Sequence, residues 1–103
     1  MAIIEHRGRQ YEVDKDGFLV RFEEWDEGWV DYIKGSEGIR QLNDAHQKVI
    51  IALQEYCKKN KKPLHISNFS EVTGIQLRTV YDLFPSGYRK GAYKMAGLKD
   101  PGG

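Results

Sequence analysis

The chain has one cysteine, Cys57, and none of the common motifs of an enzyme. A single cysteine excludes an internal disulfide framework, so we expect a protein of the reducing cytoplasm. No apolar run approaches the roughly 20 residues of a membrane-spanning helix, and no segment has the pattern of a signal peptide. A Cys-x-x-Cys pair and a glycine-rich phosphate loop are absent, and the histidines at 6, 46 and 65 are not spaced as metal ligands. The sequence therefore favours a partner-binding protein without metal or cofactor over an enzyme.

The charges of this chain divide unevenly along its length. Residues 1–45 hold six Lys/Arg against eleven Asp/Glu, whereas residues 46–103 hold ten against four. A basic C-terminal half is suited to an acidic protein surface, an anionic ligand or nucleic acid. The alternative is a solvated charged face that contacts the protein's own acidic residues. A length of 103 residues with 40% hydrophobic content predicts a single small domain.

Strand patterns are confined to the N-terminal region. Residues 3–6 and 9–13 are short extended candidates, and Arg7-Gly8 between them is a turn signal. A second turn is predicted at residues 14–17, before the apolar residues 18–20. We therefore expect a small β-hairpin region at the start of the chain.

Helical patterns occupy most of the remaining sequence. A first helix is predicted from Glu24 to Lys34, with Trp25 and Trp29 in one apolar stripe, and Gly35 and Gly38 are expected to break it. A second helix is predicted to be capped by Asn43 or Asp44 and to end near Asn60. Cys57 lies on the inner face of this helix, where a thiol acts as a small hydrophobic group. His46, near its start, is predicted to serve packing or capping.

Residues 64–84 have the pattern of two short amphipathic helices around a Thr73-Gly74 turn, which is typical of a helix-turn-helix. If this unit bound DNA, its second helix would offer Gln76, Arg78 and Thr79 to the major groove. The basic run at Lys58, Lys59, Lys61 and Lys62 could contact phosphates, or it could complement the dipole at a helix C-terminus. Because Arg78 is the single basic residue among the base-reading candidates, a structural use of this unit is favoured over DNA reading.

The last 21 residues contain a break, a short helix and an arm. Pro85-Ser86-Gly87 ends one helix and can start another, predicted from Tyr88 to Ala96 with Ala92, Met95 and Ala96 on its inner face. Gly97 is a natural C-cap. Tyr93 is predicted near the edge of the inner face, with a partly packed ring and a hydroxyl in water. Residues 99–103 offer little to bury and are predicted to form a mobile arm.

These C-terminal residues resemble the signature of a known family. The runs at residues 83–87 (LFPSG), 90–92 (KGA) and 95–98 (MAGL) are similar to the C-terminal motif of the DsrC/TusE sulfur-relay proteins, also called the gamma subunit of dissimilatory sulfite reductase. The likeness extends through most of the chain, including Trp25, Trp29 and the runs at residues 13–14, 16–19, 36–39, 46–47 and 81–85.

The resemblance implies an α+β fold that is mostly α. A small N-terminal β-hairpin region would pack on an orthogonal helical bundle, residues 1–98 forming one domain and residues 99–103 a flexible arm. It also implies a cytoplasmic protein that docks on a sulfite reductase or sulfurtransferase complex. The residues expected to dock are in the tail helix and arm: Lys90, Lys94, Gly97, Leu98, Lys99, Pro101 and Gly103. The alternative function is a helix-turn-helix regulator related to sulfur metabolism, with nucleic-acid contacts from Gln76, Arg78, Thr79, Lys61 and Lys62.

The sequence departs from this family at its functional thiols. DsrC-type relatives have one cysteine in the tail helix, at the position that matches Tyr93, and a second near the end of the arm; TusE-type relatives keep only the second. The given sequence stops at Gly103, where the family would continue with that cysteine and one more residue. Two interpretations remain at this stage: a cysteine-less relative that docks without carrying sulfur, or a sequence that lacks its terminal residues.

Overall fold

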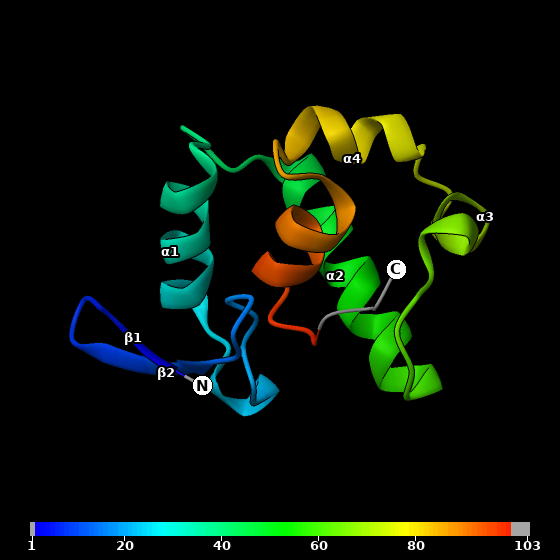
Figure 1. Cartoon of the computed structure of the whole chain (residues 1–103). Coiled ribbons are helices and arrows are strands. Elements are labelled where there is room, and N and C mark those ends of the chain that lie inside the picture. The colour runs from blue at the N-terminus through cyan, green and yellow to red at the C-terminus, as the bar shows by residue number, and fades with distance from the viewer. Residues whose placement is uncertain (1, 100–103) are drawn as a thin grey trace.

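The chain opens with a β-hairpin, β1 (Ala2–His6) and β2 (Arg9–Val13), in a computed structural model that describes residues 2–99 (Figure 1). The strands pair antiparallel with Ala2 opposite Val13. Arg7 and Gly8 both have positive φ, 53° and 80°, as a type I′ turn requires at its two central residues. The predicted hairpin and its turn are therefore confirmed, and its inner face contributes Tyr11 and Val13 to the core.

The first helix starts and ends later than predicted. Phe22–Glu24 form a separate 3-10 turn, η1, and the helix α1 runs over Glu27–Glu37. Asp26 has an extended backbone and its carboxylate accepts from the Trp29 N–H, so the helix cannot begin before this cap. The predicted break at Gly35 is wrong, because this glycine is an exposed helical residue, and the break occurs at Gly38, in the left-handed conformation.

The second helix, α2 (Asp44–Asn60), has the predicted limits. The Asn43 side chain accepts from two first-turn amides, and His46 Nδ1 accepts from the Asn43 N–H in a reciprocal capping box. This bond places the ring proton on Nε2, which lies 3.1 Å from the Leu83 carbonyl. His46 is therefore a capping and packing residue, as predicted, and it joins the start of α2 to the end of a later helix.

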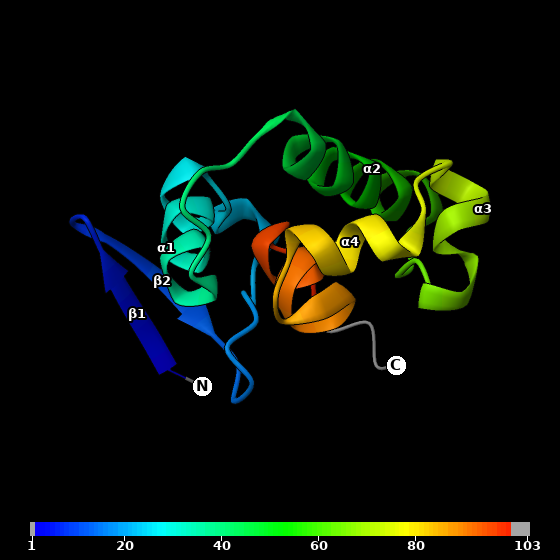
Figure 2. The ribbon, with the colours of Figure 1, turned by 90° about the horizontal axis from the view of Figure 1, so that it is seen from above.

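Two short helices follow around Gly74, also as predicted. A 3-10 turn, η2 (Ile66–Asn68), leads into α3 (Phe69–Thr73), and α4 (Leu77–Leu83) begins after Gly74. The α4 helix packs on α2 and on the C-terminal helix. Figures 1 and 2 show α3 at the side of the molecule away from the hairpin.

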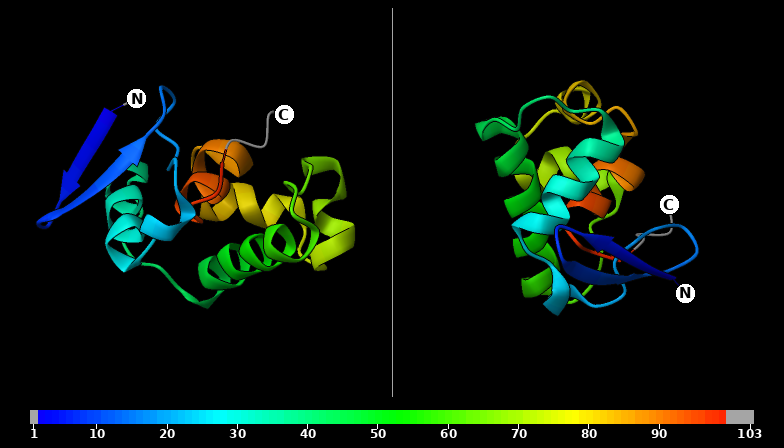
Figure 3. Two further views of the ribbon diagram at one scale, coloured as in Figure 1. Left: turned by 90° about the horizontal axis from the view of Figure 1, so that it is seen from below. Right: turned by 90° about the vertical axis from the view of Figure 1, so that its left-hand side faces the viewer.

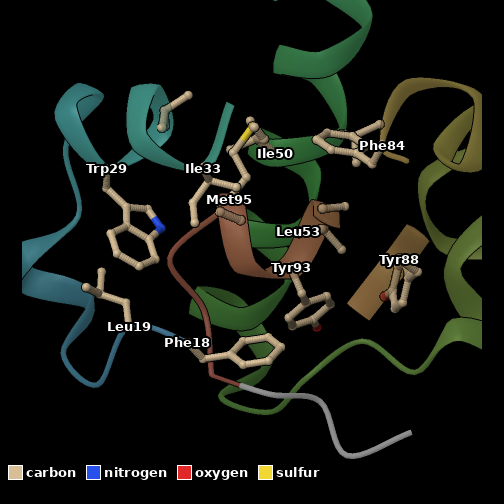
Figure 4. Close-up of a cluster of buried hydrophobic side chains, with 14 of the residues drawn as sticks. Phe18, Leu19, Trp29, Ile33, Ile50, Leu53, Phe84, Tyr88, Tyr93 and Met95 are labelled. Carbon is tan, nitrogen blue, oxygen red and sulfur yellow. The ribbon is translucent and has the colours of Figure 1, made fainter. Parts of the chain in front are cut away.

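The C-terminal helix occupies the middle of the molecule. It begins with η3 (Tyr88–Tyr93), which is a π-helix, and continues through Lys94 and Met95. Figures 1 and 2 and the two views of Figure 3 show it enclosed by α1, α2 and α4. The buried side chains of all these elements form one hydrophobic cluster, drawn in part in Figure 4. The architecture is the expected α+β fold, mostly α, with a small hairpin.

Candidate functional site: the C-terminal helix and its base

The tail helix, defined here as residues 88–96, starts at a fixed break in the chain. Gly87 has φ 87°, a conformation that favours glycine, and its N–H bonds to the Phe84 carbonyl at 2.8 Å. The carboxylate of Glu37, at the end of α1, accepts from both the backbone N–H (3.0 Å) and the hydroxyl of Ser86. The predicted break is thus confirmed, and an acidic residue 49 positions away holds it.

A π-helix aligns the two tyrosines of the tail helix. Tyr88 and Tyr93 are five residues apart, which is the hydrogen-bonding interval of a π-helix, and their rings meet edge to face at 5.2 Å. Both hydroxyls bond to the backbone of the same residue: Tyr88 donates to the Leu64 carbonyl, and the Leu64 N–H donates to Tyr93 Oη at 2.5 Å. The prediction of a wet hydroxyl at Tyr93 is wrong, because its side chain is 0% exposed. The reason is that a wider π turn rotates residue 93 from the helix edge into the core. In Figure 4 the Tyr93 ring lies among the other buried side chains.

Tyr88 and Tyr93 remain protonated, and so uncharged, near neutral pH. Burial raises the pKa of Tyr88 and of Tyr93 well above the ordinary value of 10. The half-buried thiol of Cys57 lies 3.5 Å from Tyr93 Oη, and this hydrogen bond raises the pKa of the phenol further. The phenols therefore act as neutral structural groups, and the Cys57 thiol lies directly beside Tyr93.

Side chains of the body cap the C-terminal end of the tail helix. The indole N–H of Trp29 donates to the Lys94 carbonyl at 2.8 Å, and that of Trp25 donates to the Met95 carbonyl at 2.9 Å. The Gln54 amide, on α2, donates to the next carbonyl, that of Ala96, at 2.9 Å. The last carbonyls of a helix have no partner within it, so these three donors replace water at a buried helix end. In Figure 4 the indole nitrogen of Trp29 faces the tail helix.

Gly97 completes this end as the predicted C-cap. Its φ is 75°, its N–H bonds to the Lys94 carbonyl, and the Leu98 N–H bonds to the Tyr93 carbonyl, which together make a Schellman motif. A Cβ atom at this position would lie 2.3 Å from Cδ1 of Trp25. Only glycine fits here, both for its conformation and for the close approach of the indole.

The basic side chains of the tail have different environments. Lys94 Nζ donates to the Asp16 carbonyl at 2.9 Å and lies 5.0 Å from the centre of the Phe18 ring. Partial burial, followed by the nearby charge of Lys90, lowers the pKa of Lys94. Lys90 and Lys99 are exposed. Leu98 is half-buried against the core, and the two remaining predicted docking residues, Pro101 and Gly103, lie outside the described residues.

The residues proposed for nucleic-acid contact lie on two elements. Gln76 and Arg78 are exposed and Thr79 is half-buried at the start of α4. Lys61 and Lys62 are exposed directly after α2, and Lys61 is the left-handed C-cap of that helix. In the part of the chain that the structure describes, no ion pair or hydrogen bond joins any two of these five side chains.

Within residues 2–99, no three His, Cys, Asp or Glu side chains gather as they would around a metal ion. In the same range no helix has the length and hydropathy needed to cross a membrane. Sequence reasoning assigned Trp25 and Trp29 to the core but missed their role as caps of the tail helix, and it gave no structural role to Gln54 or Glu37. A buried indole N–H signals that a partner exists, but the sequence does not show which carbonyl it is.

Comparisons with known proteins show which family shares this sequence and fold. The family model described as DsrC like protein matches residues 5–103. The chain is 50% identical over 103 residues to the protein of Nitratidesulfovibrio vulgaris named "Sulfite reductase, dissimilatory-type subunit gamma", covering 100% of this chain and 98% of that protein. It is 34% identical over 101 residues to the "Sulfurtransferase TusE homolog" of Haemophilus influenzae, covering 91% and 92%.

A solved structure agrees with these sequence matches. A chain in the crystal structure of dissimilatory sulfite reductase I superimposes with a TM-score of 0.90 at 49% identity, covering 99% of this chain and 98% of that one. The names of these relatives refer to sulfite reductase and sulfur transfer and give no support to the nucleic-acid alternative. The chain belongs to the DsrC family, the sulfur-relay family that also includes the TusE proteins.

Proposed function

We propose that this protein is a partner in sulfur transfer that docks on a sulfite reductase complex through its tail helix and the residues that follow Gly97. The relatives' names support a partner of this kind. Identity of 50% to a gamma subunit of dissimilatory sulfite reductase, against 34% to a TusE homologue, favours sulfite reductase over a sulfurtransferase complex. The protein then acts by binding and presenting its C-terminal segment, not as a catalyst by itself.

The rigid base of the tail is the observation that carries this proposal. Three body side chains cap successive carbonyls at the end of the tail helix, and the Schellman motif at Gly97 sets the direction in which the chain continues. Leu98 and Lys99 therefore leave the body from a fixed point. A preorganised base reduces the entropy that a partner must remove on binding.

The tail helix presents no thiol to that partner. The position that matches the helix cysteine of DsrC-type relatives holds Tyr93, whose hydroxyl is buried and bonded to the Leu64 N–H. A phenol cannot form a disulfide or a persulfide. We infer that the helix serves to position the C-terminal segment and that it does not hold sulfur itself.

The test is binding to dissimilatory sulfite reductase from which the gamma subunit has been removed, measured by biolayer interferometry. Deleting residues 99–103 removes exposed Lys99 and the residues after it and leaves the capped helix intact. We expect affinity to fall at least about tenfold, roughly 1.4 kcal/mol, with an unchanged urea unfolding curve. Lys48→Ala, an exposed residue in the first half of α2, is the matched control and should bind as the wild type does. Equal binding of the deletion variant and the wild type would contradict docking through this segment.

A further inference from the structure

A groove with an apolar floor lies beside the base of the tail. It consists of two adjoining hollows, of about 640 Å³ and about 210 Å³, that share Phe22, Cys57 and Leu98. The larger extends along α2 past Ile51 and Lys58, and the smaller extends past the end of α2 to Lys99. We call this surface the lysine-rimmed groove.

Two apolar side chains of this groove face solvent. Phe22 is 47% exposed and Ile51 is 48% exposed, and they are among only five large hydrophobic residues so exposed in residues 2–99. Phe22 stacks on Trp25 with ring centres 6.1 Å apart and planes 9° from parallel. Because the Trp25 indole is bonded to the Met95 carbonyl, Phe22 rests on a fixed support and is not drawn into the core. Exposed apolar patches with a polar rim are typical of protein interaction sites.

The rim of the groove is basic. Lys58, Lys61, Lys62 and Lys99 are all exposed, and Glu55 is the one acidic residue in the lining. Among the residues that the structure describes, none of these four lysines forms an ion pair. The backbone of Lys61 is fixed, because its N–H bonds to the Cys57 carbonyl at 2.8 Å. Four cations therefore surround an apolar floor without a described acidic partner.

We propose that the lysine-rimmed groove binds a segment of the partner protein in which two or three apolar side chains are flanked by Asp or Glu. The apolar side chains cover Phe22 and Ile51, and the carboxylates face the lysines. The occupant is a protein segment, since Phe22 is the one exposed aromatic ring in the described lining and this lining has no arginine, whereas single-stranded nucleic acid binds through several stacked aromatic rings and arginine.

The groove and the tail can engage one partner at the same time. Leu98 lies in the groove lining and is also the first residue after the helix cap, so an occupant sits directly beside the segment that leaves the body. Two linked contacts raise the effective concentration of each for its site. This inference rests on the proposed function, because the partner is the same sulfite reductase complex.

The test uses dissimilatory sulfite reductase without its gamma subunit as the probe and compares single variants of the full chain. Phe22→Ser and Ile51→Ser change the floor, and each is expected to weaken affinity about tenfold, mainly by faster dissociation. Lys58→Glu is expected to slow association, with a smaller effect at high salt. Val72→Ser is the matched control, because Val72 is 50% exposed on α3 outside the groove lining, and it should bind within about twofold of wild type. Urea unfolding of each variant verifies the fold.

The outcomes separate this inference from the proposed function. If the floor variants bind as the wild type does while deletion of residues 99–103 still weakens binding, the groove proposal is wrong and tail docking stands. If wild-type protein does not bind the probe, both proposals are overturned. Dimerisation by sedimentation that Ile51→Ser abolishes would assign the groove to a second copy of this chain instead. Binding of a single-stranded RNA of about 10 nucleotides, within the usual site size of a small single-strand binding fold, that Lys58→Glu alone abolishes would assign it to nucleic acid.

Discussion

Gly97→Ala tests whether the tail helix is held by the side chains that cap its end. A Cβ at this position carries two costs. An L-residue at φ 75° is disfavoured by about 1–2 kcal/mol, because the left-handed region brings Cβ near the following carbonyl. The new atom also lies 2.3 Å from Trp25 Cδ1 and 2.8 Å from Cγ, far inside the roughly 3.5–4.0 Å of a normal carbon contact.

The steric cost can be worked from the contacts of Trp25. The indole must move away by more than about 1 Å, and overpacking of this kind costs about 1–3 kcal/mol. The same movement breaks the bond from the indole N–H to the Met95 carbonyl, a net loss of about 1 kcal/mol. With the backbone term, Gly97→Ala should lower the free energy of unfolding by about 3–6 kcal/mol, and Tm by more than about 10 °C.

Gly38→Ala is the matched control. Gly38 has the same φ of 75°, ends α1 with the same pair of backbone bonds, and has nothing within 4 Å of the Cβ position. This variant should therefore lose only the backbone term, about 1–2 kcal/mol, in urea unfolding followed by far-UV circular dichroism. In a double-mutant cycle, Trp25→Ala should remove most of the extra cost of Gly97→Ala. If the two glycine variants lose equal free energy within about 0.5 kcal/mol, the close approach of Trp25 to Gly97 is not real.

Three further predictions concern the hydroxyls of two buried tyrosines and the partly buried carboxyl group of Asp26. Tyr93→Phe leaves the buried Leu64 N–H without its acceptor and should lower the free energy of unfolding in urea by about 1–3 kcal/mol. The exposed control Tyr81→Phe should change it by less than about 0.5 kcal/mol, and equal effects of the two variants would contradict the buried hydrogen bond. Burial tends to raise the pKa of Asp26, but hydrogen bonds from the Tyr11 hydroxyl and a backbone N–H outweigh burial and hold the pKa below 3.8. The carboxylate therefore stabilises the fold above that pH, and the stability difference between wild type and Asp26→Asn should shrink as the pH falls further. A difference that does not change in acid titration would refute this. Burial, followed by the hydrogen bond to Asp26, raises the pKa of Tyr11 from 10.0 to about 12. The protonated hydroxyl therefore contributes its full stabilisation below pH 10, and wild type should lose this advantage over Tyr11→Phe between pH 10 and 12. Thermal unfolding of both proteins over that range tests this, and a constant difference in Tm would contradict it.

The limits of most elements were predictable from the sequence because short local interactions set them. The Arg7-Gly8 turn, the cap at Asn43, the Gly74 turn and the C-cap at Gly97 depend on residues within a few positions of one another. The family resemblance depends on the same local runs near the C-terminus, so the mostly helical α+β fold could be predicted as well. The error in the start of the first helix also has a local cause: the cap at Asp26 makes α1 begin at Glu27, three residues after the predicted start at Glu24.

The environment of the tail helix was decided by tertiary structure. A 3.6-residue period placed Tyr93 at the helix edge, but the π turn at residues 88–93 rotates it to Leu64, 29 positions earlier in the chain. The indole of Trp25 meets a carbonyl 70 positions later, and no local pattern specifies that pairing. The lysine-rimmed groove likewise joins Phe22, Ile51 and Leu98 from three separate segments of the chain. Sequence periodicity specifies which side of a helix is apolar, whereas the partner of each buried donor and the shape of a surface depend on how the elements pack, and that is fixed only when the whole core forms.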